Sequence, residues 1–129
     1  MLVAEDNVVN QKLWQQICKR WHLTPIFAEN GQEACEICER QRFDISLREL
    51  QMPKLNGFDA TENINTNQQS LNRQTPIIAL TADAFQETKN RVMTSGFTDY
   101  VGKPFKAEEL RETILMNLKR RSETNRVDE

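Results

Sequence analysis

Residues 2–11 read Leu-Val-Ala-Glu-Asp-Asn-Val-Val-Asn-Gln. A short apolar run at the start of such a stretch is typical of a buried strand. Two carboxylates follow it directly, and Asn7 is of a residue type that often caps the first turn of a helix. Apolar residues then recur at every fourth position, as on one face of an amphipathic helix: Val9, Leu13, Ile17 and Trp21. The stretch therefore predicts a strand, an acidic turn and a helix.

Short apolar runs and amphipathic stretches alternate about five times along the chain. Further strands are predicted at 24–28, 43–50, 76–80 and 99–102, and the run at 76–80 is the most apolar of them. Such alternation produces a parallel sheet with crossover helices on both faces. The predicted fold class is α/β, a doubly wound, three-layer (βα)5 sandwich.

The remaining helices have their own start and stop signals. Asn30-Gly31 and Asn56-Gly57 open two of them, and Gly96 closes a helix predicted over 84–95. The last helix has its buried stripe at Leu110, Ile114 and Leu118. The polar segment 65–75 is predicted to be a long, mobile loop.

Composition limits the classes of function. The chain has 129 residues, a net charge of −2 and 38% apolar residues, which describes one soluble domain. No apolar run approaches the roughly 18 residues of a membrane span, and the start lacks a signal-peptide layout, so we expect a cytoplasmic protein without membrane contact. The mixed charges argue against nucleic-acid binding. Residues 1–119 are predicted to form the domain and residues 120–129 a frayed polar tail.

The three cysteines include Cys35 and Cys38 in a C-x-x-C spacing. No second pair exists to complete a zinc site, and an odd number without a secretory signal argues against a disulfide framework. Because Ala34, Cys35 and Cys38 share an apolar helix face, buried packing is the predicted role.

Polar side chains follow several of the predicted strands. In a doubly wound sheet the functional crevice lies outside the carboxyl ends of the strands. The side chains expected there come from five separate positions: Glu5, Asp6, Glu49, Thr81 and Lys103. Carboxylates, a hydroxyl and a lysine that converge at one place indicate a single functional site, which isolated polar loop residues do not.

Four segments in order, 2–11, 51–58, 76–82 and 100–105, resemble the motifs of the response-regulator receiver domain, a flavodoxin-like or CheY-like fold with sheet order 2-1-3-4-5. The first of them is most similar to receivers of hybrid sensor histidine kinases. The resemblance implies a non-enzymatic domain of a two-component phosphorelay. It further implies as partners a histidine kinase or a histidine phosphotransfer domain, and a receiver–receiver dimer, through the surface of the fourth helix, fifth strand and fifth helix.

In that family an aspartate after the third strand accepts a phosphoryl group beside a divalent ion. By resemblance Glu49 takes the acceptor position, and Thr81 and Lys103 complete the catalytic set. The implied Mg²⁺ ligands are Glu5, Asp6, Glu49 and the backbone carbonyl of Gln51, with weak or lost binding. Thr81 and Tyr100 are the implied switch pair, although a half-buried strand tyrosine explains Tyr100 equally well.

The acceptor position departs from the family pattern, because glutamate reaches roughly 1.3 Å further than aspartate. Phosphotransfer is therefore predicted to be lost or imitated. Glu49 either pairs with Lys103 in an unswitched state or directs its charge toward Thr81 and Lys103. The alternatives are a phosphorylation-independent docking module, an aspartate-dependent phosphatase or transferase, and a flavodoxin-like nucleotide binder.

A second departure lies beside it, where Ser46 and Arg48 occupy positions that similar domains fill with apolar residues. Being two apart on a strand, they share one face. Because a buried unpaired arginine costs several kcal/mol, Arg48 is predicted to reach a carboxylate or solvent. The Lys103-Pro104 peptide resembles the family's cis bond.

Overall fold

The computed structural model describes residues 1–50, 56–82, 85–103 and 106–128, with side chains as far as residue 119. Strands and helices alternate along this part of the chain: β1 (Leu2–Ala4), α1 (Val8–Arg20), β2 (Ile26–Ala28), α2 (Gly31–Arg40), β3 (Ser46–Glu49), α3 (Gly57–Thr66), β4 (Ile77–Thr81), α4 (Gln86–Thr94), β5 (Asp99–Gly102) and α5 (Ala107–Asp128). All strand pairs are parallel, in the order β2-β1-β3-β4-β5. The predicted fold class and sheet order are confirmed, and β2 and β3 begin later than predicted.

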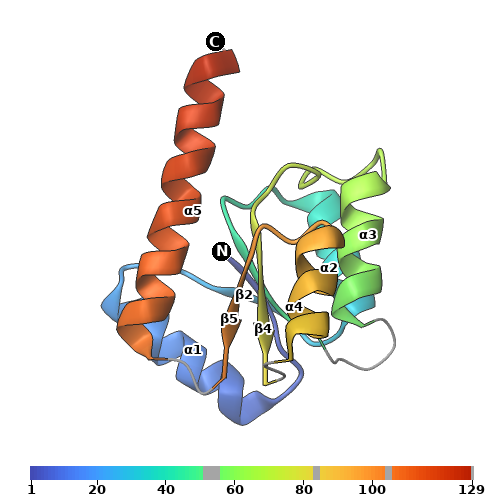
Figure 1. The fold of residues 1–129 in the computed structure, drawn as a ribbon. Helices are drawn as coiled ribbons and strands as arrows, with labels where there is room; N and C mark the ends of the chain where they lie inside the picture. The colour runs from blue at the N-terminus through green and yellow to red at the C-terminus, as the bar shows by residue number, and fades with distance from the viewer. Residues whose placement is uncertain (51–55, 83–84, 104–105, 129) are drawn as a thin grey trace.

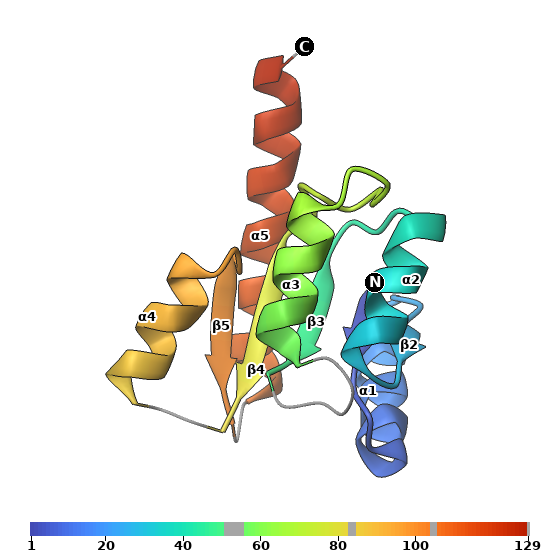
Figure 2. The same cartoon turned by 90° about the vertical axis from the view of Figure 1, so that its right-hand side faces the viewer.

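The sheet lies between two helical layers (Figure 1). Helices α1 and α5 cover one face, and α2, α3 and α4 cover the other, as Figure 2 shows. Side chains from alternate strand positions fill each interface, so Val3, Leu47 and Ile78 pack beneath α1 and α5. Every residue of β4 is buried, as expected for the most apolar run of the chain.

Helix α1 presents a different face to the sheet than its apolar spacing predicted. Ile17 is buried, but Val9 and Leu13 are 74% and 47% exposed. Trp14 and Cys18 take the inward positions instead. The helix face that packs on the sheet is rotated by about one residue from the predicted face. The reason is that the large Trp14 ring buries more apolar area against the sheet than Leu13 would. The displaced apolar side chains remain on the surface.

The segment after α3 is anchored, contrary to the predicted mobile loop. Helix α3 extends to Thr66, and the loop is held by the buried side chain of Asn72. Its Oδ1 accepts from the backbone N–H of Phe43 at 2.7 Å, and its Nδ2 donates to the carbonyls of Cys38 at 2.9 Å and Gln41 at 2.7 Å. One asparagine thus satisfies backbone groups from the end of α2 to the start of β3.

Helix α5 buries Leu110 and Ile114 and then projects beyond the sheet (Figure 1). Its backbone is helical to Asp128, so a frayed tail from residue 120 is not what the structure shows. The predicted domain boundary at residue 119 stays a prediction. In the described ranges no helix combines the length and apolarity needed to cross a membrane.

Every cysteine of the chain lies in the described part, and all three are buried and free of disulfide bonds. Burial raises the pKa of the Cys38 thiol to about 11. It also raises the pKa values of Cys18 and Cys35. The prediction of buried packing is confirmed.

Candidate functional site: an acidic cleft at the carboxyl ends of the strands

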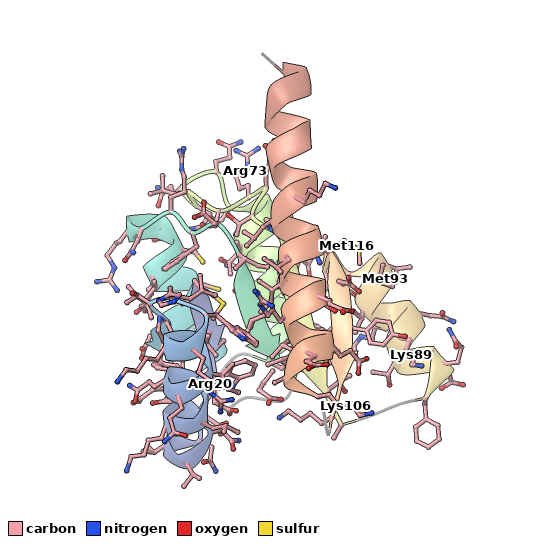
Figure 3. The ribbon with its side chains drawn as sticks, turned by 90° about the vertical axis from the view of Figure 1, so that its left-hand side faces the viewer. Arg20, Arg73, Lys89, Met93, Lys106 and Met116 are labelled. Carbon is pink, nitrogen blue, oxygen red and sulfur yellow. The ribbon has the colours of Figure 1, made fainter. Side chains whose placement is uncertain are left out.

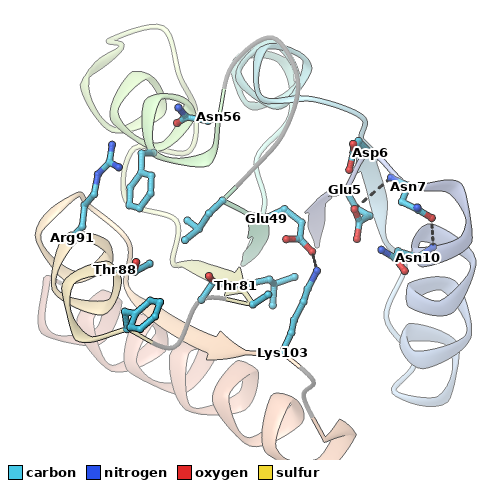
Figure 4. A pocket seen from close by; sticks show the side chains of 15 residues that line it. Glu5, Asp6, Asn7, Asn10, Glu49, Asn56, Thr81, Thr88, Arg91 and Lys103 are labelled. Atoms are coloured by element: carbon cyan, nitrogen blue, oxygen red, sulfur yellow. Dashed lines mark hydrogen bonds and ion pairs between the residues drawn. The ribbon is translucent and has the colours of Figure 1, made fainter.

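The five side chains predicted to converge all line one cleft at the carboxyl ends of the strands (Figure 4). The parallel topology brings them together: β1 ends before Glu5, β3 ends at Glu49, β4 ends at Thr81, and Lys103 follows β5. These positions are far apart in sequence. Their proximity follows from the strand order, because β1, β3, β4 and β5 are consecutive neighbours in the sheet.

The two carboxylates after β1 differ in environment. Glu5 is 2% exposed, whereas Asp6 is exposed. Burial raises the pKa of the Glu5 carboxyl, opposed in part by the backbone N–H of Asn7 and the charge of Lys103. Asn7 caps α1, because its Oδ1 accepts from the N–H of Asn10 at 3.1 Å. The cap fixes where the helix begins and thus where both carboxylates lie.

Glu49 and Lys103 form an ion pair inside the cleft. Lys103 Nζ donates to Glu49 Oε1 across the end of β4 (Figure 4). The backbone N–H of Lys103 donates to the carbonyl of Thr81 at 2.7 Å, which holds the lysine against β4. Contact with Lys103 belongs to both arrangements predicted for Glu49, so the choice between an unswitched and an imitated state stays a prediction. The side chains are 13% and 30% exposed, so water partly screens the pair.

Oxygen ligands for a divalent cation are present but not assembled. Glu5, Asp6 and Glu49 line the same cleft, and hard carboxylate oxygens are what Mg²⁺ prefers. Within the described ranges, however, no three acidic, histidine or cysteine side chains are grouped closely enough to hold a metal ion. The Glu49 carboxylate is turned to Lys103 instead. Gln51 and the Lys103-Pro104 peptide lie outside the described residues.

Tyr100 is half-buried on β5, beside Ala79 of β4. Lys89 Nζ lies 5.4 Å from its ring centroid, a cation–π distance. This contact is compatible with a switch and with an ordinary strand tyrosine, so the role of Tyr100 stays a prediction.

The cleft extends further than the sequence indicated. Side chains from α3 and α4 line its far side, among them Phe58, Thr88 and Arg91 (Figure 4). The Arg91 guanidinium lies 3.8 Å from the Phe58 ring centroid. Phe58 ends the motif segment 51–58 but was not assigned to the site, and Arg91 carried no motif signal, because the helices meet only in the tertiary structure. Asn10, one turn after the Asn7 cap, also lines the cleft and could have been found from helical spacing.

The prediction for Arg48 is wrong. Its side chain is 0% exposed and, in the part of the chain the structure describes, reaches no carboxylate. Two hydroxyls take that place: Nη1 donates to Thr61 Oγ1 at 2.7 Å and Nη2 to Ser46 Oγ at 3.4 Å. Ser46 and Arg48 do share one face, as predicted. The neighbours of Arg48 on the adjacent strands are Ala4 and Ala79, whose small side chains leave room for it.

A doubly wound sheet with carboxylates after β1 and β3, a hydroxyl at the end of β4 and a lysine after β5 defines the class of phosphorelay signalling domains. Residues 1–115 match the model of the response regulator receiver domain, and the chain belongs to this family.

Relatives and solved structures agree with this assignment. The chain is 35% identical over 121 residues to a hybrid signal transduction histidine kinase K of Dictyostelium discoideum, covering 90% of this chain and 10% of that protein. It therefore spans about a tenth of that relative's length. It is similar to the receiver domain of a Pseudomonas aeruginosa sensor histidine kinase solved with a magnesium ion in its active-site cleft (TM-score 0.82, 34% identity, 92% of this chain and 95% of that chain).

A third match comes from a co-crystal structure of the histidine phosphotransfer signaling protein of Saccharomyces cerevisiae with the receiver domain of its downstream response regulator. It has a TM-score of 0.78 and 30% identity, and covers 88% of this chain and 83% of that chain. The chain is thus a receiver domain of a two-component phosphorelay, regulatory rather than catalytic by itself.

Proposed function

We propose that Glu49 occupies the phosphoacceptor position of this receiver and that phosphotransfer is lost, or replaced by a partial imitation of the phosphorylated state. The observation that carries the proposal is the ion pair of Glu49 with Lys103 inside the acidic cleft. A carboxylate attacks phosphorus through a free oxygen held in line with the leaving group. Here one oxygen of Glu49 is bound to the lysine. Because the side chain is longer, the other oxygen does not take the position that an aspartate oxygen would have for in-line attack.

The same ion pair favours a receiver that signals constitutively, and it argues against a receiver whose site is inactive. The Glu49 carboxylate itself supplies Lys103 with an anion at the end of β3. The imitation is incomplete, because a carboxylate has one negative charge and two oxygens, whereas a phosphoryl group has up to two charges and three oxygens.

Magnesium binding is proposed to be weak. Glu5 and Asp6 supply two carboxylates at one side of the cleft, and the third would have to leave Lys103. Breaking a partly screened ion pair in exchange for a metal bond reduces the net gain of binding.

The test is phosphorylation by a small-molecule phosphodonor with MgCl₂, followed by intact mass spectrometry of three chains: the parent, Glu49→Asp and Glu49→Gln. We expect only Glu49→Asp to gain the mass of one phosphoryl group. Glu49→Gln is the matched control, since it keeps the length of the side chain and removes its charge. Stoichiometric labelling of the parent that Glu49→Gln abolishes would refute the loss of phosphotransfer.

We further propose that a histidine phosphotransfer domain docks on α1, rather than on the surface of α4, β5 and α5 that the resemblance implied. The helix exposes three apolar side chains, Val8, Val9 and Leu13, immediately beside the cleft-lining Asn7 and Asn10. An apolar patch at the mouth of the site fits a partner that presents its histidine to the cleft, whether or not a phosphoryl group is transferred there. The co-crystal relative supports this choice of partner.

Calorimetry with a histidine phosphotransfer domain tests this surface. Leu13→Lys is expected to weaken binding at least tenfold, since it places a charge in the apolar contact. Met93→Lys on α4, 52% exposed and remote from α1, is the matched control. Equal loss in both variants, or none in Leu13→Lys, contradicts docking on α1.

A receiver–receiver dimer is proposed to use a different face. Met93 of α4 and Met116 of α5 lie on one side of the molecule near Lys89 (Figure 3), and both are exposed. Sedimentation velocity of Met116→Lys is expected to show loss of any dimer that the parent forms. If the unsubstituted chain forms a dimer and that dimer persists in this variant, the face is excluded.

From the relatives of this chain, we propose that the protein to which it belongs is a hybrid sensor histidine kinase.

A further inference from the structure

Helix α3 rests directly on the backbone of the residue that carries the site. The N–H of Gly57 donates to the carbonyl of Leu50 at 2.9 Å. A Cβ added at Gly57 would lie 2.4 Å from the Glu49 carbonyl oxygen and 2.9 Å from the Leu50 Cα. Only glycine permits this approach, so a displacement of β3 at Glu49 moves the first turn of α3 as well.

One turn further along α3, Thr61 accepts from the guanidinium of Arg48. Of the two hydrogen bonds that Arg48 makes among the described residues, the one to Thr61 is the shorter. The Arg48 side chain is wholly buried, and its Nε has no hydrogen-bond partner among those residues. A buried charge with so few partners is strongly destabilised if its best acceptor moves away. The strand and the helix are therefore joined by a contact that resists stretching, at the residue next to Glu49.

The C-terminal end of α3 contacts the connection between α4 and β5. Asn65 Nδ2 donates to the carbonyl of Gly96 at 3.2 Å. Gly96 has a φ of +95°, and a Cβ added there would lie 2.4 Å from Asn65 Nδ2 and 3.4 Å from Thr61 Cγ2. Thr61 thus touches Arg48 through its hydroxyl and lies against Gly96 with its methyl group.

We propose that Arg48 is a positioning residue that couples residue 49, through Thr61, to the α4–β5 connection at Gly96. The coupling runs along successive turns of α3, at Gly57, Thr61 and Asn65, and uses neither Thr81 nor Tyr100. It rests on the proposed function only in taking Glu49 as the side chain that responds to signals. The competing explanation is that Arg48 merely fills the space beside Ala4 and Ala79, which a methionine would fill equally well.

Amide NMR of the full chain separates the two explanations. Glu49→Gln removes the charge that holds Lys103, and the resulting shift changes are recorded at Gly96 and Phe97. The same substitution is then made in Thr61→Val and Arg48→Met backgrounds. Thr66→Val is the matched control, because among the described residues the exposed Thr66 hydroxyl bonds within α3, to the carbonyl of Glu62. Val101 and Gly102, near Lys103, report that the perturbation has occurred in each background.

We expect the response at Gly96 and Phe97 to fall to about half or less in the Thr61→Val and Arg48→Met backgrounds, and to persist in Thr66→Val. The response at Val101 and Gly102 should persist throughout. An undiminished response at Gly96 in both backgrounds, or none in the parent, overturns the coupling. If Thr61→Val unfolds, Arg48→Met decides alone, since replacing a buried charge by an apolar side chain of similar length is tolerated. The readout needs no phosphoryl group, so it stands apart from the phosphodonor result.

Discussion

Lys103 Nζ donates to the carboxylate of Glu49 across the end of β4, so the cation that follows β5 neutralises the last residue of β3. The pair lies in a cleft that also contains Glu5 and Asp6. Lys103 therefore competes with any divalent cation for Glu49.

Removing the lysine should strengthen magnesium binding. We expect Lys103→Met to raise the affinity about tenfold, or about 1.4 kcal/mol, because Glu49 is freed and a like charge leaves the cleft. Calorimetric titration with MgCl₂ measures the change. Lys106→Met makes the same chemical change at an exposed position and should leave the affinity unaltered. An unchanged or weaker affinity in Lys103→Met would show that the lysine does not compete.

Glu5 should make stability depend on pH. Burial raises the pKa of its carboxyl in the folded state, which favours the neutral form. Its contribution is therefore fully present below the ordinary carboxyl pKa and is lost as the pH rises through the raised value. We expect Glu5→Gln to be more stable than the parent at pH 7.5, with a difference that shrinks toward pH 4.5.

Urea unfolding at a series of pH values measures this difference. Asp6→Asn is the control, since that side chain is exposed and no burial penalty applies. A difference between Glu5→Gln and the parent that stays constant over the range contradicts the assignment.

Asn72 should be among the most sensitive positions of the fold. Asn72→Ala removes the acceptor of the Phe43 N–H and the Thr75 hydroxyl, and the donor to two backbone carbonyls. We expect a loss of about 3 kcal/mol in the free energy of unfolding. Asn67→Ala loses two exposed bonds, one to Glu39 and one from the N–H of Gln69, and should cost about 1 kcal/mol. Similar losses in both variants would mean that burial of the network is not what stabilises the loop.

The three thiols should be inert in the native protein. Burial raises the pKa of Cys38 to about 11, so its reactive thiolate is scarce at pH 8. Labelling with a disulfide reagent at pH 8 is expected to be slow until denaturant is added, and then to modify all three cysteines. Rapid labelling of the folded chain would instead show that α2 opens locally.

Much of the architecture followed from the order of residues alone. The apolar run at 76–80 identified a strand buried on both faces, and the asparagines at 7, 30 and 56 marked helix starts, which the structure confirms as caps. The convergence of Glu5, Glu49 and Lys103 was also predictable. The reason is that parallel strands in a doubly wound sheet bring their carboxyl ends to one edge whatever the side chains between them.

Contacts between elements were decided by the tertiary structure. Apolar spacing located α1 but not its rotation, because the space beneath the helix favours Trp14 over Leu13. Spacing also could not show that Arg48 would be buried against Thr61, or which partner the Glu49 carboxylate would take. Such choices depend on the distance and chemistry of groups far away in sequence, and local propensity contains no information about them. The sequence by itself determined the sheet, its order and the edge at which the site lies, whereas the fold decided how the charges in and beneath that site are paired.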